Sequence, residues 1–259
     1  MSFLITLSPA KRLDFETPAP DFPATQPKFE NQARTLIQTA RLWSVEDIAA
    51  RMKLSPDLAS LNHARYHAFK LRGKTGGTRR PALYAFQGDV YQGLDAASLT
   101  IEQVLKAQGA IRILSGLYGL LRPLDAIQPY RLEMGTRVET DAGHSLYAFW
   151  GNTIARALNT EAKASGATAL LNLASQEYFK AVDLKALKLP LLTCHFKEMR
   201  NGKPTIVSFN AKRARGLMAR YLITTGAQSN DHIRGFNAEG YAFVPELSDE
   251  TNLTFLKEG

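Results

Sequence analysis

The chain has 259 residues, of which 45% are hydrophobic and 22% charged, and its formal net charge is +8. No apolar run approaches the roughly 18 residues that a membrane-spanning helix needs, and a single cysteine, Cys194, excludes intrachain disulfides. We therefore expect a globular protein of the cytoplasm with no membrane anchor and no bound cofactor, whose positive charge favours anionic partners.

The first third of the chain is predicted to hold one strand followed by helices. Residues 3–7 form a short apolar run that stops at Ser8-Pro9, and four prolines between residues 16 and 27 indicate an irregular connector. Apolar residues then recur at helical spacing from Phe29 to Ala40. Two further helix starts are expected at Ser44 with Asp47 and at Ser55-Pro56. These three helices define a helical portion over about residues 28–72.

From residue 82 onward, short apolar runs of strand length alternate with helical patterns. The expected strands are 82–86, 110–114 and 169–173. Thr100 with Gln103 is expected to cap a helix, and Ser145 is expected to cap another that continues to Asn159.

The last third is predicted to contain a hairpin, a helix and two edge strands. Asn201-Gly202 favours a tight turn between strands 193–197 and 205–209. Asn210 is the expected N-cap of the following helix, and late edge strands are expected at 241–244 and 253–256. The predicted fold class is therefore one mixed α/β domain over residues 1–259, with an N-terminal helical portion and a mixed sheet.

The basic residues are unevenly distributed along the chain. Residues 62–80 contain six Lys or Arg and no acid, and residues 196–220 contain seven against Glu198 alone. Residues 239–258 are the reverse, with five acids and one Lys. This asymmetry predicts a cationic surface apart from an acidic tail, and two ordinary solvated faces are the alternative.

Two glycine- and cation-containing segments are candidate binding sites. Lys11 follows the sharp end of the first strand, at Ser8-Pro9. Gly116 and Gly119 have a spacing that permits close approach to a phosphate backbone, although a tight structural turn explains it equally well. Arg131 and Glu133 follow in a loop that is rich in Gly and Pro.

A third candidate segment is the expected start of the helix near residue 211. Lys212, Arg213 and Arg215 would lie in about its first turn, where the helix dipole disfavours cations. A bound phosphate would offset that cost. We therefore predict phosphate contact here, with a merely solvated basic face as the alternative.

Two other patterns suggest metal or nucleophile chemistry but are better explained structurally. His63 and His67 have the i,i+4 spacing of metal ligands, yet no third ligand lies at a fixed spacing. Cys194 and His195 are neighbours in a strand and would face opposite sides, so a buried free cysteine is expected. We predict no metal site.

Taken together, seven segments along nearly the whole chain resemble the YaaA family of bacterial proteins (DUF328, or UPF0246). They are SPAK from Ser8, GDVYQG from Gly88, LSGLYGLLRP from Leu114, QPYRLEMG from Gln128, NLASQEY from Asn172, KRARG from Lys212 and GFNAEGY from Gly235. The resemblance implies a helix-hairpin-helix-like element, a positive cleft that binds DNA, and a role in surviving hydrogen peroxide by limiting free iron. Gln87 and Asn210 depart from the family pattern, which has Lys and commonly an aromatic there.

The principal hypothesis is a DNA-binding protein of the hydrogen peroxide stress response. Lys11, Lys212, Arg213 and Arg215 would contact phosphates with little sequence specificity, and Arg131 and the Gly116–Gly119 turn would support the cleft. The aromatic residues proposed to stack on an exposed base are Tyr118, Tyr130 and Tyr178. The form of DNA, duplex or distorted, and the oligomeric state are left open.

An alternative hypothesis is an enzyme of glycosylase or lyase type that acts on damaged nucleic acid. Its attacking amine would be Lys11 or Lys212. Its carboxylate would be Asp89, Glu133 or Glu177, although Asp89 and Glu133 are better explained as ion-pair partners of Arg131 or Lys11. Direct iron binding is a third hypothesis, for which five His and one Cys provide no compact ligand set.

Overall fold

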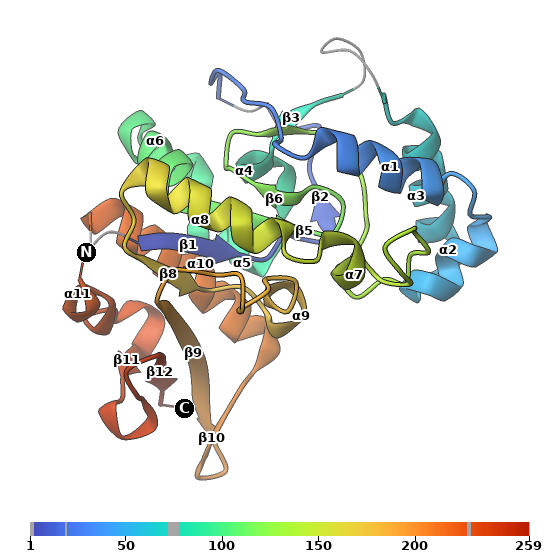
Figure 1. The fold of residues 1–259 in the computed structure, drawn as a ribbon. Helices are drawn as coiled ribbons and strands as arrows, with labels where there is room; N and C mark the ends of the chain where they lie inside the picture. Colours follow the sequence, from blue (N-terminus) through green and yellow to red (C-terminus); the bar gives the residue numbers. More distant parts are fainter. Residues whose placement is uncertain (1–2, 19, 72–77, 227–228, 259) are drawn as a thin grey trace.

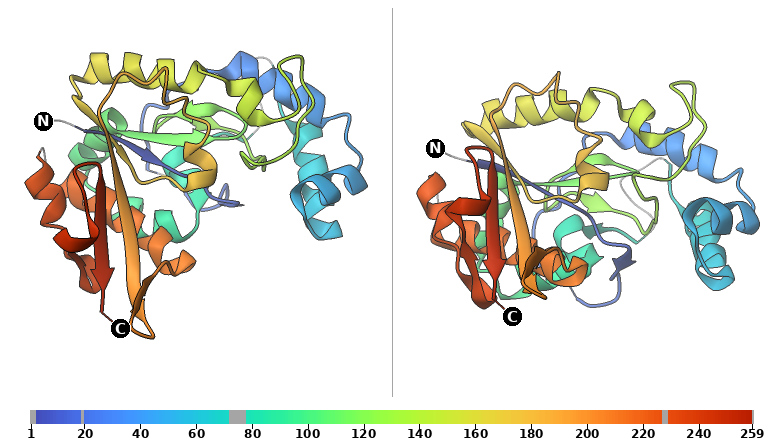
Figure 2. Two further views of the ribbon diagram at one scale, coloured as in Figure 1. Left: turned by 60° about the horizontal axis from the view of Figure 1, so that its bottom comes forward. Right: turned by 90° about the horizontal axis from the view of Figure 1, so that it is seen from below.

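Three short apolar segments lie side by side in the middle of the molecule and are buried along their whole length. In this computed structural model, which describes residues 3–18, 20–71, 78–226 and 229–258, they are β1 (Phe3–Leu7), β5 (Ile111–Ser115) and β8 (Ala169–Asn172). β1 pairs in parallel with β5 on one side and with β8 on the other. Helices cover both faces, with α8 (Thr153–Ser165) on one and α6 (Ile101–Ala110) and α10 (Ser208–Thr225) on the other (Figures 1 and 2). Continuous apolar strands are typical of parallel sheets covered in this way.

The sheet continues beyond β8 and β5 into an eight-stranded mixed sheet with the order β11-β12-β9-β8-β1-β5-β6 and β10 paired to β9. The added strands are β6 (Gly119–Leu121), β9 (Leu191–Arg200), β10 (Lys203–Thr205), β11 (Tyr241–Phe243) and β12 (Asn252–Lys257). β8, β9 and β12 are mutually parallel, whereas β6, β10 and β11 pair antiparallel with their neighbours. Residues of β9 alternate between buried and half-buried, as expected of a strand with one well-covered face.

The helical portion stands at the end of the molecule opposite β11 and β12 (Figure 1). It comprises α1 (Glu30–Ala40), α2 (Val45–Met52) and α3 (Pro56–Ala68), as the sequence predicts. The capping box at α2 is formed, because Ser44 and Asp47 each accept the other's backbone N–H, at 3.1 and 3.0 Å. The predicted box at α6, between Thr100 and Gln103, is also formed. The predicted helix-hairpin-helix-like element stays a prediction.

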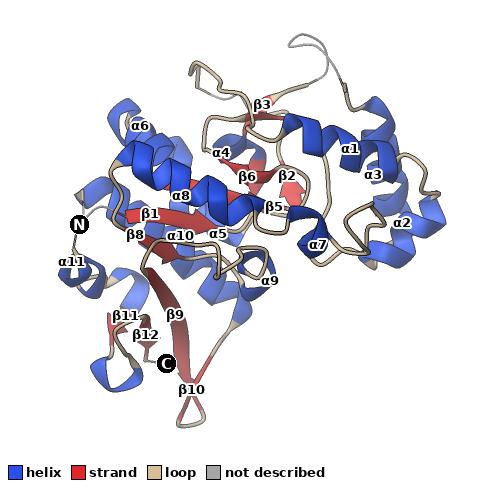
Figure 3. Cartoon of the chain, viewed as in Figure 1, coloured by secondary structure: helices blue, strands red, loops and turns tan. Residues whose placement is uncertain are grey.

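The remaining elements are short and connect these parts (Figure 3). Two-residue strands β2 (Arg12–Leu13) and β4 (Phe86–Gln87) pair with each other, as do β3 (Arg80–Pro81) and β7 (Ala126–Ile127). The other helices are α4 (Ala82–Ala85), α5 (Asp89–Leu94), α7 (Leu146–Trp150), α9 (Gln176–Phe179) and α11 (Asn230–Arg234), with 3-10 turns η1 (Ala96–Ser98), η2 (Ala238–Gly240) and η3 (Pro245–Leu247). No helix in the described ranges is long and apolar enough to cross a membrane.

Two predicted elements in the middle of the chain differ from the structure. The run at 82–86 is not a strand, because Ala82–Ala85 form one buried helical turn; a short apolar run fits a buried turn of helix as well as a strand. The helix expected from Ser145 to Asn159 is two helices. Gly151 has φ +45° and ψ −122°, which ends α7, and α8 begins at Thr153.

The C-terminal third also corrects the predicted boundaries. Asn201 and Gly202, with φ of 51° and 72°, make the predicted tight turn, but the second hairpin strand stops at Thr205. Helix α10 already begins at Ser208, with Val207 as the N-cap, so Asn210 does not cap it. β12 lies between β11 and β9, which leaves β11 alone of these two at the edge.

Helices α5 and α10 cross in backbone contact through one glycine on each. A Cβ atom added to Gly216 would lie 1.8 Å from the carbonyl oxygen of Val90, and one added to Gly93 would lie 2.2 Å from that of Arg213. Real Cβ atoms do not approach so closely, so both positions require glycine. The crossing fixes α5 against the second and third turns of α10.

We predict that Gly216→Ala lowers the free energy of unfolding by about 1–3 kcal/mol or more, because the helices must separate to admit the methyl group. Gly109→Ala is the matched control. Gly109 lies in α6, where an added Cβ meets nothing within 4 Å, so this variant gains about 0.5–1 kcal/mol from helix propensity. Urea titrations of both variants measure the difference. Equal stability of the two variants would show that α5 and α10 do not need the close crossing.

Candidate functional site

A cavity of about 520 Å³ lies beyond the carboxyl ends of β1 and β8. We call it the cleft; it is lined by residues 8–12, 87–91 and 175–178 and by Lys212 and Arg215. Within the large sheet, the strand that follows β1 along the chain is β5, which lies on one side of it. The strand that follows β8 is β9, which lies on the other side. β1 and β8 are therefore the adjacent parallel strands at which the strand order reverses. Ligands of open parallel sheets bind outside such a point, so the topology alone marks this cavity.

The loops that leave β1 and β8 are tied together at the base of the cleft. The backbone N–H of Ser175 donates to Oγ of Ser8 at 2.8 Å, and the Ser8 hydroxyl donates to Oγ of Ser175 at 3.3 Å. The hydroxyl of Tyr91, on α5, donates to the carbonyl oxygen of Ser8 at 3.1 Å. These bonds join the ends of the two strands to α5. Lys11, in the segment after β1, and Gln176, at the start of α9, therefore line the same cavity.

Lys212 and Arg215 enter the cleft from the second turn of α10. Lys212 is exposed, Arg215 is half-buried, and neither has a hydrogen bond or ion pair to any residue that the structure describes. Burial lowers the pKa of Arg215. The structure thus brings both side chains to one cavity, and their contact with phosphate stays a prediction. The dipole argument for that contact is wrong, because α10 begins at Ser208 and the dipole effect fades after the first turn.

Lys11 reaches the cleft, while Arg131 stands behind it. Nζ of Lys11 lies 2.7 Å from Oε2 of Glu133, and Nη2 and Nε of Arg131 lie 2.9 and 3.1 Å from the other oxygen, Oε1. The Lys11 side chain is 62% exposed, whereas that of Arg131 is 14% exposed and does not line the cavity. Glu133 thus holds both cations, and Arg131 supports the position of Lys11.

Three predicted contact residues lie outside the cleft. Arg213 forms a two-pronged ion pair with Glu239, with Nη2 and Nε 2.6 and 2.8 Å from Oε1. Gly116 and Gly119 are buried, Gly116 against the carbonyl of Leu132 and Gly119 against the indole of Trp150. Their close approach is to the protein's own core, so they serve the tight structural turn that the sequence left as the alternative.

Of the three tyrosines proposed to stack on a base, only Tyr178 lines the cleft. Tyr118 and Tyr130 are buried, and burial raises the pKa of each. The Tyr130 hydroxyl lies 2.6 Å from that of Ser115, and the Tyr118 hydroxyl accepts the N–H of Gln128 at 3.1 Å. They are core residues and cannot meet a base.

The sequence did not single out two side chains, one in the cleft and one near it along α10. Arg12 is exposed, lines the cleft, and its side chain has no hydrogen bond or ion pair to a described residue. It follows Lys11 directly, and that adjacency was the available signal. Phe209 is 57% exposed and lies three residues before Lys212 on α10. The sequence pattern predicts a strand over residues 205–209, whereas Phe209 belongs to α10.

The types of group that lyase chemistry needs do occur in the cleft. Lys212 and Asp89 both line it, and Asp89 forms no ion pair within the described ranges. Glu177 lines it as well, with Oε1 accepting the N–H of Gly135 at 3.0 Å. Glu133 is paired, as above. The enzymatic alternative stays a prediction.

Comparison with known proteins identifies the family. Residues 3–247 match the family model described as peroxide stress protein YaaA. This chain belongs to that family. Its relatives include UPF0246 proteins of Delftia acidovorans (51% identical over 258 residues, 98% of each chain) and Aliivibrio fischeri (49% over 255 residues, 98% of each). Another, from Bordetella avium, is 50% identical over 252 residues, which are 97% of this chain and 98% of that one. A role in peroxide stress is consistent with this membership.

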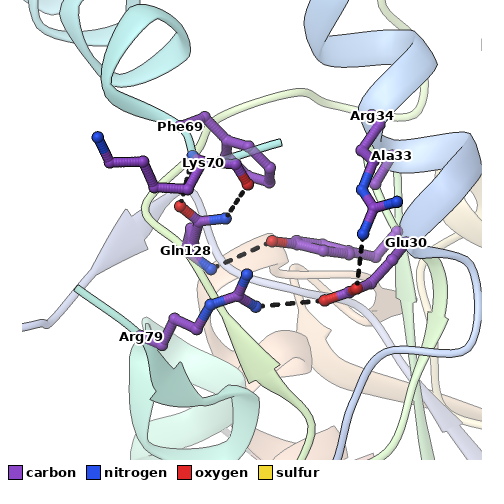
Figure 4. Close-up of a pocket in the computed structure, with 8 residues that line it drawn as sticks. Glu30, Ala33, Arg34, Phe69, Lys70, Arg79 and Gln128 are labelled. Atoms are coloured by element: carbon purple, nitrogen blue, oxygen red, sulfur yellow. Dashed lines mark hydrogen bonds and ion pairs between the residues drawn. The ribbon is translucent and has the colours of Figure 1, made fainter. Parts of the chain in front are cut away.

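A second hollow in this YaaA family member is too small for a ligand (Figure 4). Its volume is about 10 Å³, enough for one water molecule. Glu30 accepts from Arg34 and Arg79 at 3.3 and 3.2 Å. Gln128 exchanges two hydrogen bonds with the backbone of Lys70, at 2.8 and 3.1 Å. The network fastens α1 and the end of α3 to the loop after β7, so we regard it as structural.

The described part of the chain contains no group of three or more His, Cys, Asp or Glu side chains that could hold a metal ion. Cys194 is buried, and burial raises the pKa of its thiol. His195 is half-buried and bonded through Nε2 to Oδ1 of Asn252 at 3.1 Å. The effect on iron that the resemblance implies stays a prediction.

Asn210, one of the two residues that depart from the family pattern, forms a hydrogen bond in this structure. Its side-chain amide donates to the buried carboxylate of Glu198 on β9. Glu198 also accepts from Nη2 of Arg200 at 2.8 Å and from the hydroxyl of Tyr241 at 3.4 Å. Burial opposes ionisation of Glu198, but the hydrogen bonds from Arg200 and Asn210 outweigh it and hold the pKa below its ordinary value. This carboxylate fastens the start of α10, and with it Lys212, to the sheet.

We predict that Glu198 stabilises the fold above pH 4.5, its ordinary pKa, and that this contribution is lost as the pH falls through the lower folded-state pKa. Glu198→Gln removes the charge, so it costs about 1–3 kcal/mol at pH 7 and flattens the fall in stability below pH 4.5. Glu246→Gln is the control, at an exposed carboxylate bonded to no described residue. Urea titrations from pH 7 to pH 3 measure both; parallel curves for wild type and Glu198→Gln would contradict the assignment.

Proposed function

We propose that this protein binds DNA through the cleft, mainly by contacts to phosphates, as its part in the peroxide stress response. The observation that carries the proposal is the convergence of Lys212 and Arg215, without carboxylate partners in the described ranges, on a cavity at the switch point of the sheet. Phosphate contacts give affinity with little sequence information, because every nucleotide presents the same group.

The charge of the cleft lining supports a polyanion. Four cations line it, namely Lys11, Arg12, Lys212 and Arg215, against the two carboxylates of Asp89 and Glu177. Lys11, Arg12 and Lys212 are exposed and would meet a strand that passes along the mouth. Arg213 and Arg131, which the sequence would have added, do not line the cleft, and of the four cations that do, Lys11 is ion-paired with Glu133. The proposed footprint is therefore smaller than the sequence predicted.

We expect binding to duplex DNA to weaken linearly with the logarithm of salt concentration, with a slope of about −0.9 per phosphate contacted. Lys212→Gln should weaken binding and reduce that slope by about 0.9, because one contact is lost. Arg213→Gln is the matched control: it removes an equal charge one residue away on α10, but from an ion pair outside the cleft. Fluorescence anisotropy from low to high salt measures all three slopes. Equal effects of the two substitutions, or no salt-sensitive binding at micromolar protein, would overturn the proposal.

Phe209 is suited to contact a base where the duplex is interrupted. It is exposed, it precedes Lys212 by about one helical turn, and the exposed Ile206 lies close by in sequence. Aromatic side chains beside cations stack on unpaired bases without regard to sequence.

Phe209→Ala should therefore lower the affinity for bulged DNA by about 1–3 kcal/mol, and that for intact duplex by less, because a paired base offers no free face. Leu42→Ala removes an even more exposed apolar side chain, just after the end of α1, and should change neither. Anisotropy titrations with matched bulged and duplex oligonucleotides separate the outcomes. Equal loss on both DNA forms would assign Phe209 a structural role.

A further inference from the structure

Arg215 is an exception among the inward-facing guanidinium groups of the described chain. Nε of Arg215 is buried without a hydrogen-bond partner, as are the Nε atoms of Arg80 and Arg112. Unlike theirs, the Arg215 side chain also has no other hydrogen bond and no ion pair in the described ranges. By contrast, Arg112 donates to Glu161 at 2.8 Å and to the carbonyls of Gln108 and Ile111. Arg80 likewise contacts a carbonyl, that of Thr17, and lies 3.9 Å from a carboxylate oxygen of Asp14.

The surroundings of Arg215 leave its charge uncompensated. The ionisable group that acts on its charge is Cys194, whose buried thiol stays neutral because burial raises its pKa. An arginine does not lose its proton under these conditions, although burial lowers its pKa. A desolvated cation without a counterion costs free energy in the unliganded protein. An anion that enters the cleft would recover that cost.

The cavity around Arg215 has the size and walls of a small-molecule site. Its 520 Å³ falls within the range of about 300–1,000 Å³ that ligand pockets span. Apolar and aromatic side chains, among them Pro9, Tyr91 and Tyr178, form much of the wall. Asp89 adds a carboxylate that has no hydrogen bond to a described residue and can accept from a ligand N–H or O–H.

We infer that Arg215 anchors a nucleotide site within the cleft: its guanidinium binds one phosphate group, and the adjoining walls hold the attached nucleoside. A guanidinium matches two phosphate oxygens with two parallel hydrogen bonds, which a lysine cannot do. The inference rests on the proposed function, since a strand bound along the cleft would supply an unstacked nucleotide. A free nucleotide has the same chemistry and is the other source.

The probe is deoxythymidine 5′-monophosphate (dTMP), and thymidine and inorganic phosphate are tested for comparison. Calorimetry measures the affinity of each compound, and thermal unfolding measures the melting temperature of the protein in its presence. dTMP should bind and raise the melting temperature, phosphate should do so less, and thymidine least. Arg215→Met keeps the apolar stem and removes the charge. It should weaken dTMP binding about tenfold or more and leave the unliganded melting temperature equal or higher, because an uncompensated charge is gone. Arg215→Lys should bind dTMP with intermediate affinity.

Arg220→Met is the matched control on the same helix. Arg220 donates to the carbonyls of Leu94 and Asp95 at 3.0 and 2.9 Å, outside the cleft. Its loss should lower the melting temperature while the response to dTMP is retained. If Arg215→Met instead lowers the melting temperature as Arg220→Met does, or binds dTMP as wild type does, the inference is wrong.

Two further comparisons show whether the nucleotide is free or part of a strand, and distinguish failure of the nucleotide site from failure of the proposed DNA binding. Displacement of dTMP by a bulged oligonucleotide supports a nucleotide within a strand, and binding of dTMP without displacement supports a free nucleotide. Salt-dependent binding of duplex DNA by a wild-type protein that ignores dTMP overturns the nucleotide site and leaves DNA binding intact. The reverse result, dTMP binding without DNA binding, overturns the proposed function instead.

Discussion

The contact between α5 and α10 at Gly93 and Gly216 is the constraint on which the cleft depends. The two helices leave no room for a Cβ atom at either position, so each backbone fixes the position and orientation of the other helix. That crossing sets Asp89, at the start of α5, and Lys212 and Arg215, on the second turn of α10, around a common space. Without it, chain segments more than a hundred residues apart would have no fixed relation.

The sheet provides the opposite wall of that space. β1 and β8 are adjacent and parallel, and the loops that leave them diverge because the chain proceeds to opposite sides of the sheet. The bond between Ser8 and Ser175 keeps the loops from separating further at their base. A cavity at this point follows from strand order, and α5 and α10 supply the side chains that give it charge. Topology thus decides where the cleft lies, and the glycine crossing decides what lines it.

Local patterns in the sequence predicted local structure well, because caps, turns and buried runs depend on a few neighbouring residues. The boxes at Ser44 and Thr100, the Asn201-Gly202 turn and strands β1, β5 and β8 are of this kind. The helical turn at Ala82–Ala85 was missed since its four buried residues fit either structure. At the site, the sequence indicates the segments containing Lys11 and Lys212 and the pairing of Glu133 with Lys11 or Arg131, but not the pairing of Arg213 with Glu239. Whether a cation meets Glu133, Glu239 or no carboxylate is decided by residues that are distant in sequence.

The pattern of partners also explains why net charge is a poor guide to the site. The excess of basic residues drew attention equally to Arg213 and Arg215, which are two positions apart on one helix. Arg213 is paired with Glu239 in the free protein, whereas Arg215 lines a cavity and has no carboxylate partner among the described residues. A paired guanidinium must give up one carboxylate to gain a phosphate, so its net contribution to binding is small. An unpaired and desolvated one gains the full interaction, and for that reason the missing partner, more than the number of charges, locates the site where an anion would bind.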